Sequence, residues 1–153
     1  MERGHLIRGI FALAALVLAI AAPAGAAVSW RVLADGPSAG AGAPALDGYV
    51  ALDRAATARF TARLGTGAAA LTRVDWTKDA VVAIFGEFGC EDQLVTISSI
   101  VQKGASLRVV LVKKSPPPGT AECMAIFGTY RLLAVPRATL RKPLPTRAVI
   151  TLA

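Results

Sequence analysis

Residues 81–97, VVAIFGEFGCEDQLVTI, decide the fold, because two strongly apolar runs flank a short polar insert. Apolar runs bounded by turn residues are typical of β-strands, so this stretch predicts two strands joined by a turn. The insert gathers Glu87, Cys90, Glu91 and Asp92. Three roles fit that composition: a metal site, a catalytic group or a solvated turn.

Strand patterns continue downstream of this stretch. Residues 93–101 and 106–114 flank the turn sequence KGA and predict a β-hairpin. Two sets of side chains are each expected on one face of their strand: Val95, Ile97 and Val101 in the first, and Leu107, Val109 and Leu111 in the second. Residues 123–136 and 146–152 also have strand character.

Upstream of the strands, residues 53–64 predict one amphipathic helix. Asp53 is a suitable N-cap, and Gly65 is a suitable stop. Apolar side chains recur every four residues, at Leu52, Ala56, Phe60 and Leu64. The expected fold class is therefore α+β, a mostly antiparallel β-sheet or sandwich with this helix packed on it.

The N-terminus predicts a signal peptide over residues 1–27. Two arginines precede an unbroken apolar run at residues 10–22, and Ala24 and Ala26 offer small residues for an A-x-A cleavage. The alternative is an uncleaved N-terminal anchor. Cleavage would leave about 126 residues, enough for one domain. We expect an exported bacterial protein, periplasmic or extracellular, with no stable membrane span after cleavage.

The predicted mature chain has two parts. Residues 28–48 are expected to form a strand or arm followed by a Gly/Pro/Ala-rich linker, and residues 49–153 the α+β domain. The only two cysteines, Cys90 and Cys123, lie in that domain. Two cysteines in an oxidising compartment usually pair, so a structural disulfide is expected.

Residue usage argues against catalysis. The only histidine is His5, inside the predicted signal peptide, which removes Ser-His-Asp, Cys-His and most zinc chemistry. Carboxylates remain as one route to a hydrolase: Glu87, Glu91, Asp92 and Glu122. These acids match no calcium-loop spacing, so no metal and no cofactor is expected. The interpretation of the insert is a solvated turn held by the disulfide.

The chain is basic, with a formal net charge of +7. A candidate basic contact set comprises Lys113, Lys114, Arg137, Arg141 and Lys142, and Arg147 extends it along the connection before the last strand. A basic exported domain can meet an acidic partner or an anionic polymer. No nucleic acid is expected, because no basic helix interleaves with aromatic residues.

The order of motifs resembles the PrcB-like domain family, which is named after a small exported subunit of a bacterial surface protease complex. The resemblance covers roughly residues 46–138. A helix after a short strand leads to a V-D-W step at residues 74–76, then to an apolar strand ending in Gly86, a hairpin and V-P-R at residues 135–137. Members often carry a Thr-Gly-Gly-Tyr turn after the apolar strand, where this chain has residues 88–91 and keeps only Gly89.

The resemblance implies a non-catalytic exported domain that binds or stabilises a protein partner, such as an envelope or secreted protease. A candidate partner-contact turn then comprises Glu87, Phe88, Gly89, Glu91 and Asp92. A small-ligand or anionic-polymer binding module is the alternative, using the basic contact set. A carboxylate-based hydrolase is the third class.

Overall fold

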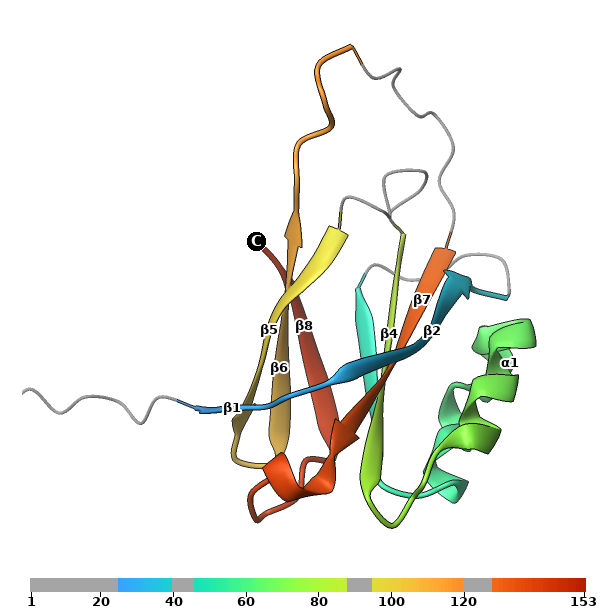
Figure 1. Cartoon of the computed structure of the whole chain (residues 1–153), viewed down its shortest axis with the longest axis vertical. Helices are drawn as coiled ribbons and strands as arrows, with labels where there is room; N and C mark the ends of the chain where they lie inside the picture. Colours follow the sequence, from blue (N-terminus) through green and yellow to red (C-terminus); the bar gives the residue numbers. More distant parts are fainter. Residues whose placement is uncertain (1–24, 40–45, 88–94, 120–127) are drawn as a thin grey trace, which may run out of the picture.

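The computed structural model describes residues 25–39, 46–87, 95–119 and 128–153 (Figure 1). Within these ranges the strands form two four-stranded sheets, mostly antiparallel, beside one helical layer. Sheet A has the order β1-β5-β6-β8: Ala26–Ala27, Val95–Lys103, Ser106–Lys113 and Arg147–Leu152. Sheet B has the order β2-β7-β4-β3: Arg31–Pro37, Gly128–Pro136, Asp79–Glu87 and Asp47–Ala51. The α+β fold class is confirmed.

The predicted hairpin is β5–β6 of sheet A. Its turn contains Gly104 at φ +58°, a conformation that glycine adopts without steric cost. Strand β8 pairs with β6 in parallel, because the chain reaches it from β7 in the other sheet through the short 3₁₀ helix η4 (Arg137–Thr139) and the connection that follows.

One face assignment is wrong. The register of β5 shifts between Ile97 and Ser99, so Val95 and Ile100 point inward while Val101 lies on the opposite face. Val101 pairs with the exposed Arg108. A β-bulge inserts one extra residue and reverses the alternation beyond it. Its position is not visible in the apolar pattern.

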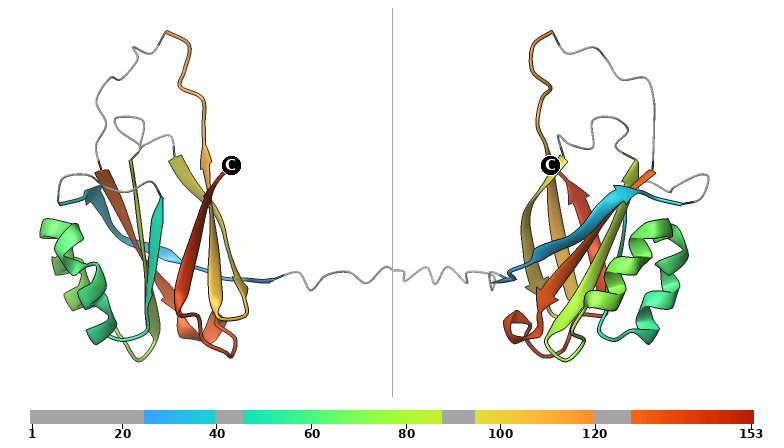
Figure 2. Two further views of the ribbon diagram at one scale, coloured as in Figure 1. Left: turned by 180° about the vertical axis from the view of Figure 1, so that it is seen from behind. Right: turned by 45° about the vertical axis from the view of Figure 1, so that its right-hand side comes forward.

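The central strands of sheet B, β4 and β7, are buried on both faces. Every side chain of β4 from Asp79 to Gly86 is buried, because sheet A covers one face of this sheet and the helical layer covers the other (Figure 2). Between the sheets lie Val28, Val82, Ile84, Leu107 and Leu133, among others. Beneath the helical layer lie Phe60, Leu64, Phe85, Tyr130 and Leu132, among others.

The helical layer is longer than the predicted helix, and most of it is 3₁₀ helix rather than α-helix. It runs through the 3₁₀ helix η1 (Ala55–Arg59), the α-helix α1 (Thr61–Leu64) and the 3₁₀ helix η2 (Gly65–Arg73). The Oδ1 atom of Asp53 accepts a hydrogen bond from the Ala56 amide at 2.8 Å, as expected of a capping side chain. Gly65, Thr66 and Gly67 disfavour a helix, whereas residues 68–71 (AAAL) favour one. Burial of Ala70 and Leu71 against sheet B adds the stabilisation that so short a helical segment lacks by itself.

The expected arm is part of the domain. Residues 31–37 form β2, the edge strand of sheet B, and β1 pairs with β5 at the edge of sheet A. Along the opposite side, β3 packs on β8: a Cβ at Gly48 would stand 2.6 Å from Ile150 Cδ1. In the described part of the chain, no helix is long and apolar enough to cross a membrane.

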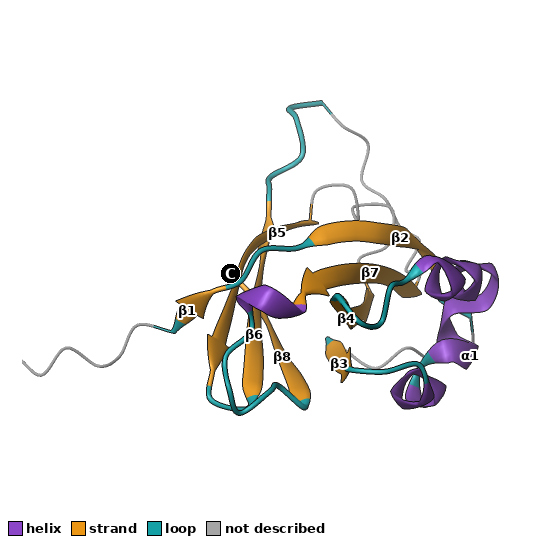
Figure 3. Ribbon diagram, turned by 60° about the horizontal axis from the view of Figure 1, so that its bottom comes forward, coloured by secondary structure: helices purple, strands orange, loops and turns teal. Residues whose placement is uncertain are grey.

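These layers leave one sheet face open. The order is helical layer, sheet B, sheet A, so the outer face of sheet A has no described element over it (Figure 3). Its strands accordingly alternate between buried and accessible side chains, as β6 does along its length.

Candidate functional site: the basic face of sheet A

Charge is segregated between the two halves of the described chain. Residues 25–39 and 46–87, which build most of sheet B and the helical layer, carry six basic and six acidic residues. Residues 95–119 and 128–153, which build most of sheet A, carry nine basic residues and no acidic residue. All the net charge of the described residues therefore lies on the second half, where sheet A has its open face.

Three cations gather at one end of that face. A hollow of about 500 Å³ lies there. We call the six residues that line it the basic face: Lys103, Ser106, Arg108, Arg147, Val149 and Thr151. Three adjacent strands supply these residues, with Lys103, Ser106 and Arg147 side by side in one register row. Neighbouring strands lie about 4.8 Å apart, which places the Cα atoms of Lys103 and Arg147 about 10 Å from each other.

Hydroxyl and apolar groups accompany these cations. Arg147 Nε donates a hydrogen bond to Ser106 Oγ at 2.6 Å, which holds the guanidinium over the sheet. Two register rows further along, on the same face, Arg108 lies between Val101 and Val149, and Val149 is 45% exposed. The basic face is therefore a mixed surface, in which exposed valine stands among positive charges.

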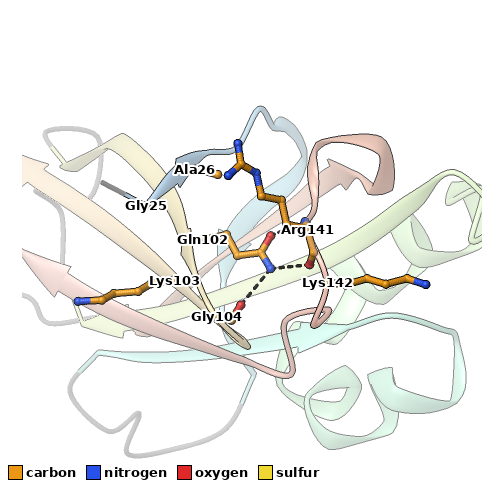
Figure 4. Close-up of a pocket in the computed structure, with 7 residues that line it drawn as sticks. All are labelled: Gly25, Ala26, Gln102, Lys103, Gly104, Arg141 and Lys142. Atoms are coloured by element: carbon orange, nitrogen blue, oxygen red, sulfur yellow. Dashed lines mark hydrogen bonds between the residues drawn. The ribbon is translucent and has the colours of Figure 1, made fainter. Parts of the chain in front are cut away.

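A second, smaller hollow adjoins the basic face. It measures about 200 Å³ and is lined by Gly25, Ala26, Gln102, Lys103, Gly104, Arg141 and Lys142 (Figure 4). In Figure 4 the side chains of Lys103 and Lys142 point in opposite directions, and Arg141 extends toward Ala26. These three cations do not converge on one point, so the hollow lacks the geometry of a compact anion site.

Gln102 has a structural role in this hollow, because its side chain links two backbone segments. Its side chain is inside the protein, with the residue only 5% exposed. Its Nε2 donates to the carbonyl oxygens of Gly104 (3.0 Å), Arg141 (2.8 Å) and Pro143 (3.0 Å), while its Oε1 accepts from the Arg141 amide (2.8 Å). One amide thereby fixes the connection before β8 to the hairpin turn.

The structure divides the predicted basic contact set. Lys113 lies seven residues beyond Ser106 on β6, about 23 Å along the strand from the Arg147 row, and Lys114 follows it. Arg137 donates hydrogen bonds to the carbonyl oxygens of Leu52 and Asp79 and so ties η4 to sheet B. Arg141 and Lys142 alone of that set lie near the basic face.

Lys103 and Arg108 were not singled out from the sequence. The available signal was the absence of any acidic residue from 93 to 121 and from 123 to 153. These acid-free segments form one basic surface only when β5, β6 and β8 pair side by side in sheet A.

The predicted cysteine turn lies outside the described residues. This applies to Phe88, Gly89, Cys90, Glu91 and Asp92 on one side, and to Glu122 and Cys123 on the other. The backbone of Glu87 is described, and it pairs with Gly128 where β4 meets β7. The strands that lead to the two cysteines are therefore neighbours, and the disulfide stays a prediction.

A polar cluster lies under the helical layer. Asp47 Oδ2 accepts hydrogen bonds from Tyr49 Oη (2.7 Å) and Arg63 Nη1 (2.8 Å). The Arg63 guanidinium carbon lies 3.8 Å from the centre of the Phe85 ring. Its Nη2 is buried with no hydrogen-bond partner, and the negative face of that ring stabilises it instead. Among the described residues, no three metal-ligating side chains cluster.

These contacts set the pKa of Asp47. Burial opposes ionisation, but the hydrogen bonds from Tyr49 and Arg63 outweigh it and hold the pKa of Asp47 below its usual value. The same bond to Asp47, with burial, raises the pKa of Tyr49. The cluster stabilises β3 against α1, with no ligand required.

Replacing Asp47 with asparagine should lower the free energy of unfolding at pH 7 by about 1 kcal/mol or less, since the Asp47 side chain is 33% exposed. Because folding lowers its pKa, the stabilisation is complete above the unfolded pKa and is lost as pH falls through the folded pKa. In urea titrations the free energies of unfolding of the two proteins should therefore converge as the pH falls through the folded pKa of Asp47. Asp35→Asn, at an exposed site on β2, is the control. A difference in the free energy of unfolding that stays unchanged down to pH 2 would contradict an ionic origin of the stabilisation by Asp47.

No protein-family model, curated protein or solved structure matches this chain. The resemblance to PrcB-like domains accordingly stays a prediction. Function has to be argued from the surface itself.

Proposed function

We propose that this chain is a non-catalytic exported domain that binds an acidic protein partner through its basic face. One observation carries the proposal: the open face of sheet A presents Lys103, Arg108 and Arg147 from three strands that contain no acidic residue. The central strands of sheet B have no comparable face, because sheet A covers one side of them and the helical layer covers the other.

The mixture of groups on the basic face favours a protein over a simple polyanion. An exposed valine beside cations matches a protein interface, which combines apolar contact with a charged rim. Two of the three cations are arginines, whose planar guanidinium groups bind carboxylates through two parallel hydrogen bonds. Aspartate and glutamate side chains on a partner would provide those carboxylates.

An anionic polymer is the second candidate. The size of the hollow, about 500 Å³, and the hydroxyls of Ser106 and Thr151 would also suit phosphate or carboxylate groups along a chain. The exposed Val149 would then gain nothing from binding. A protease as the protein partner is a finer proposal, and it rests only on the family resemblance.

Charge reversal tests the proposal. Arg108→Glu with Arg147→Glu should weaken binding of the partner at least tenfold, because attraction becomes repulsion at the centre of the basic face. Arg54→Glu with Arg73→Glu changes the net charge equally on the exposed helical layer and should leave affinity within about twofold. Each protein would be used as bait in an envelope extract. The retained protein would be identified by mass spectrometry, purified and titrated.

The outcomes separate the candidates. Retention of one acidic protein by the parent and the control, but not by the reversed variant, supports the proposal. Equal retention by both variants removes the basic face from the function. Binding of polyphosphate or an acidic polysaccharide, without a retained protein, favours the second candidate. Partner binding should also weaken near 1 M salt, where the screening length falls to about 3 Å.

A further inference from the structure

The sequence offers two overlapping signals for removal of the leader. Ala22-Pro23-Ala24 would direct cleavage before Gly25, whereas Ala24-Gly25-Ala26 would direct it before Ala27. Both have the small residues that signal peptidases require, so the pattern alone does not choose between them. The folded position of residues 25–28 distinguishes the two products.

Residues 25–28 are built into sheet A. Ala26 and Ala27 pair with Gln102 and Val101, and the Val28 amide donates a hydrogen bond to the Ile100 carbonyl at 2.9 Å. Val28 is 3% exposed and belongs to the core between the sheets. The segment therefore covers an edge of β5 that would otherwise have free backbone groups.

Gly25 itself is fitted to this edge. A Cβ at this position would overlap Val101 Cγ1 and would stand 2.8 Å from the Gln102 carbonyl oxygen. Such a close approach to another backbone admits glycine alone among the residues. Gly25 and Ala26 also line the hollow that Gln102 and Arg141 share.

We propose that the leader is removed by hydrolysis of the Ala24–Gly25 bond, and that Gly25 is the first residue of the mature domain. Water adds across the amide, which leaves a carboxylate on Ala24 and an ammonium group on Gly25. The new ammonium belongs to Gly25, which lines the hollow together with Arg141 (Figure 4), and it adds a positive charge beside the basic face.

Cleavage before Ala27 would produce a less complete domain. It would remove Gly25 and Ala26, and with them the pairing to Gln102.

The full-length chain, expressed in an exporting bacterium, tests the proposal by intact mass and N-terminal sequencing. A mature protein that begins at Gly25 supports it; a protein that begins at Met1, Ala27 or Val28 overturns it. Ala22→Phe blocks only the first signal and should stop or relocate processing. Ala26→Phe blocks only the second and should leave cleavage at Gly25. The reverse pattern overturns the proposal.

A stability measurement tests the structural reason separately. Chains made directly to begin at Gly25 or at Ala27 should differ in melting temperature, with the Ala27 chain lower by about 3–6 °C. Equal melting temperatures would overturn the argument from the fold. The inference depends on export and not on the proposed partner, so loss of partner binding leaves these results unchanged.

Discussion

Replacing Cys90 and Cys123 with serine is expected to lower the free energy of unfolding by about 2–5 kcal/mol. The pairing of Glu87 with Gly128 brings one end of β4 beside one end of β7. Cys90 lies three residues after Glu87, and Cys123 lies five residues before Gly128. A disulfide needs Cα atoms within roughly 7 Å, and the pairing of β4 with β7 makes neighbours of the two strands that lead to the cysteines. The link closes a loop that contains the whole β5–β6 hairpin, so its loss frees the unfolded chain.

Guanidinium unfolding of the oxidised parent and the double serine variant measures this difference. The parent in reducing buffer should match the variant, because both lack the bridge. Thiol titration of the denatured, unreduced protein should find no free thiol. Two free thiols would contradict the disulfide and would reopen the metal and nucleophile hypotheses for the cluster of Glu87, Cys90, Glu91 and Asp92.

Replacing Gln102 with leucine is expected to lower the free energy of unfolding by about 2–4 kcal/mol. Leucine has a similar volume but leaves the Arg141 amide without its acceptor and three carbonyl oxygens without their shared donor. Buried backbone groups without partners cost more than the average hydrogen bond contributes. The connection that carries Arg141 and Lys142 should also loosen from the hairpin turn.

Urea unfolding measures the loss, and hydrogen exchange locates it. The Arg141 amide should exchange faster in Gln102→Leu, while amides of β4 should keep their relative protection. Lys103→Ala, at the neighbouring exposed position, is the control and should change stability by about 0.5 kcal/mol or less. A variant as stable as the parent would contradict this expectation and would show that water takes over the hydrogen bonds of the Gln102 side chain.

Local patterns predicted several elements correctly. The hairpin followed from alternation on both sides of a glycine turn, and Leu107, Val109 and Leu111 are buried as expected. Phe60 and Leu64 are buried at the face that their spacing predicts. These features depend on neighbours close in sequence, so the pattern contains the information they need.

The errors arose where distant residues decide. The bulge in β5 turned Val101 outward, and only pairing with β6 reveals it. Residues 65–73 became helical because sheet B buries Ala70 and Leu71. The basic contact set followed proximity in sequence, whereas Lys103, Arg108 and Arg147 meet through strand register and Lys113 lies at the other end of β6.

The sequence by itself determined the α+β class, the hairpin, the apolar faces of β6 and of the helical layer, and the excess of positive charge after Asp92. Each of these depends on composition or on a period of two to four residues. The tertiary structure alone decided which sheet face stayed open and which cations lie on that face. Strand order and layer stacking join residues that are far apart in the sequence, such as Lys103 and Arg147 at 44 positions, and no local period encodes that distance. The hydrophobic effect requires only that apolar faces be buried; the path of the chain between the sheets determines which face remains open.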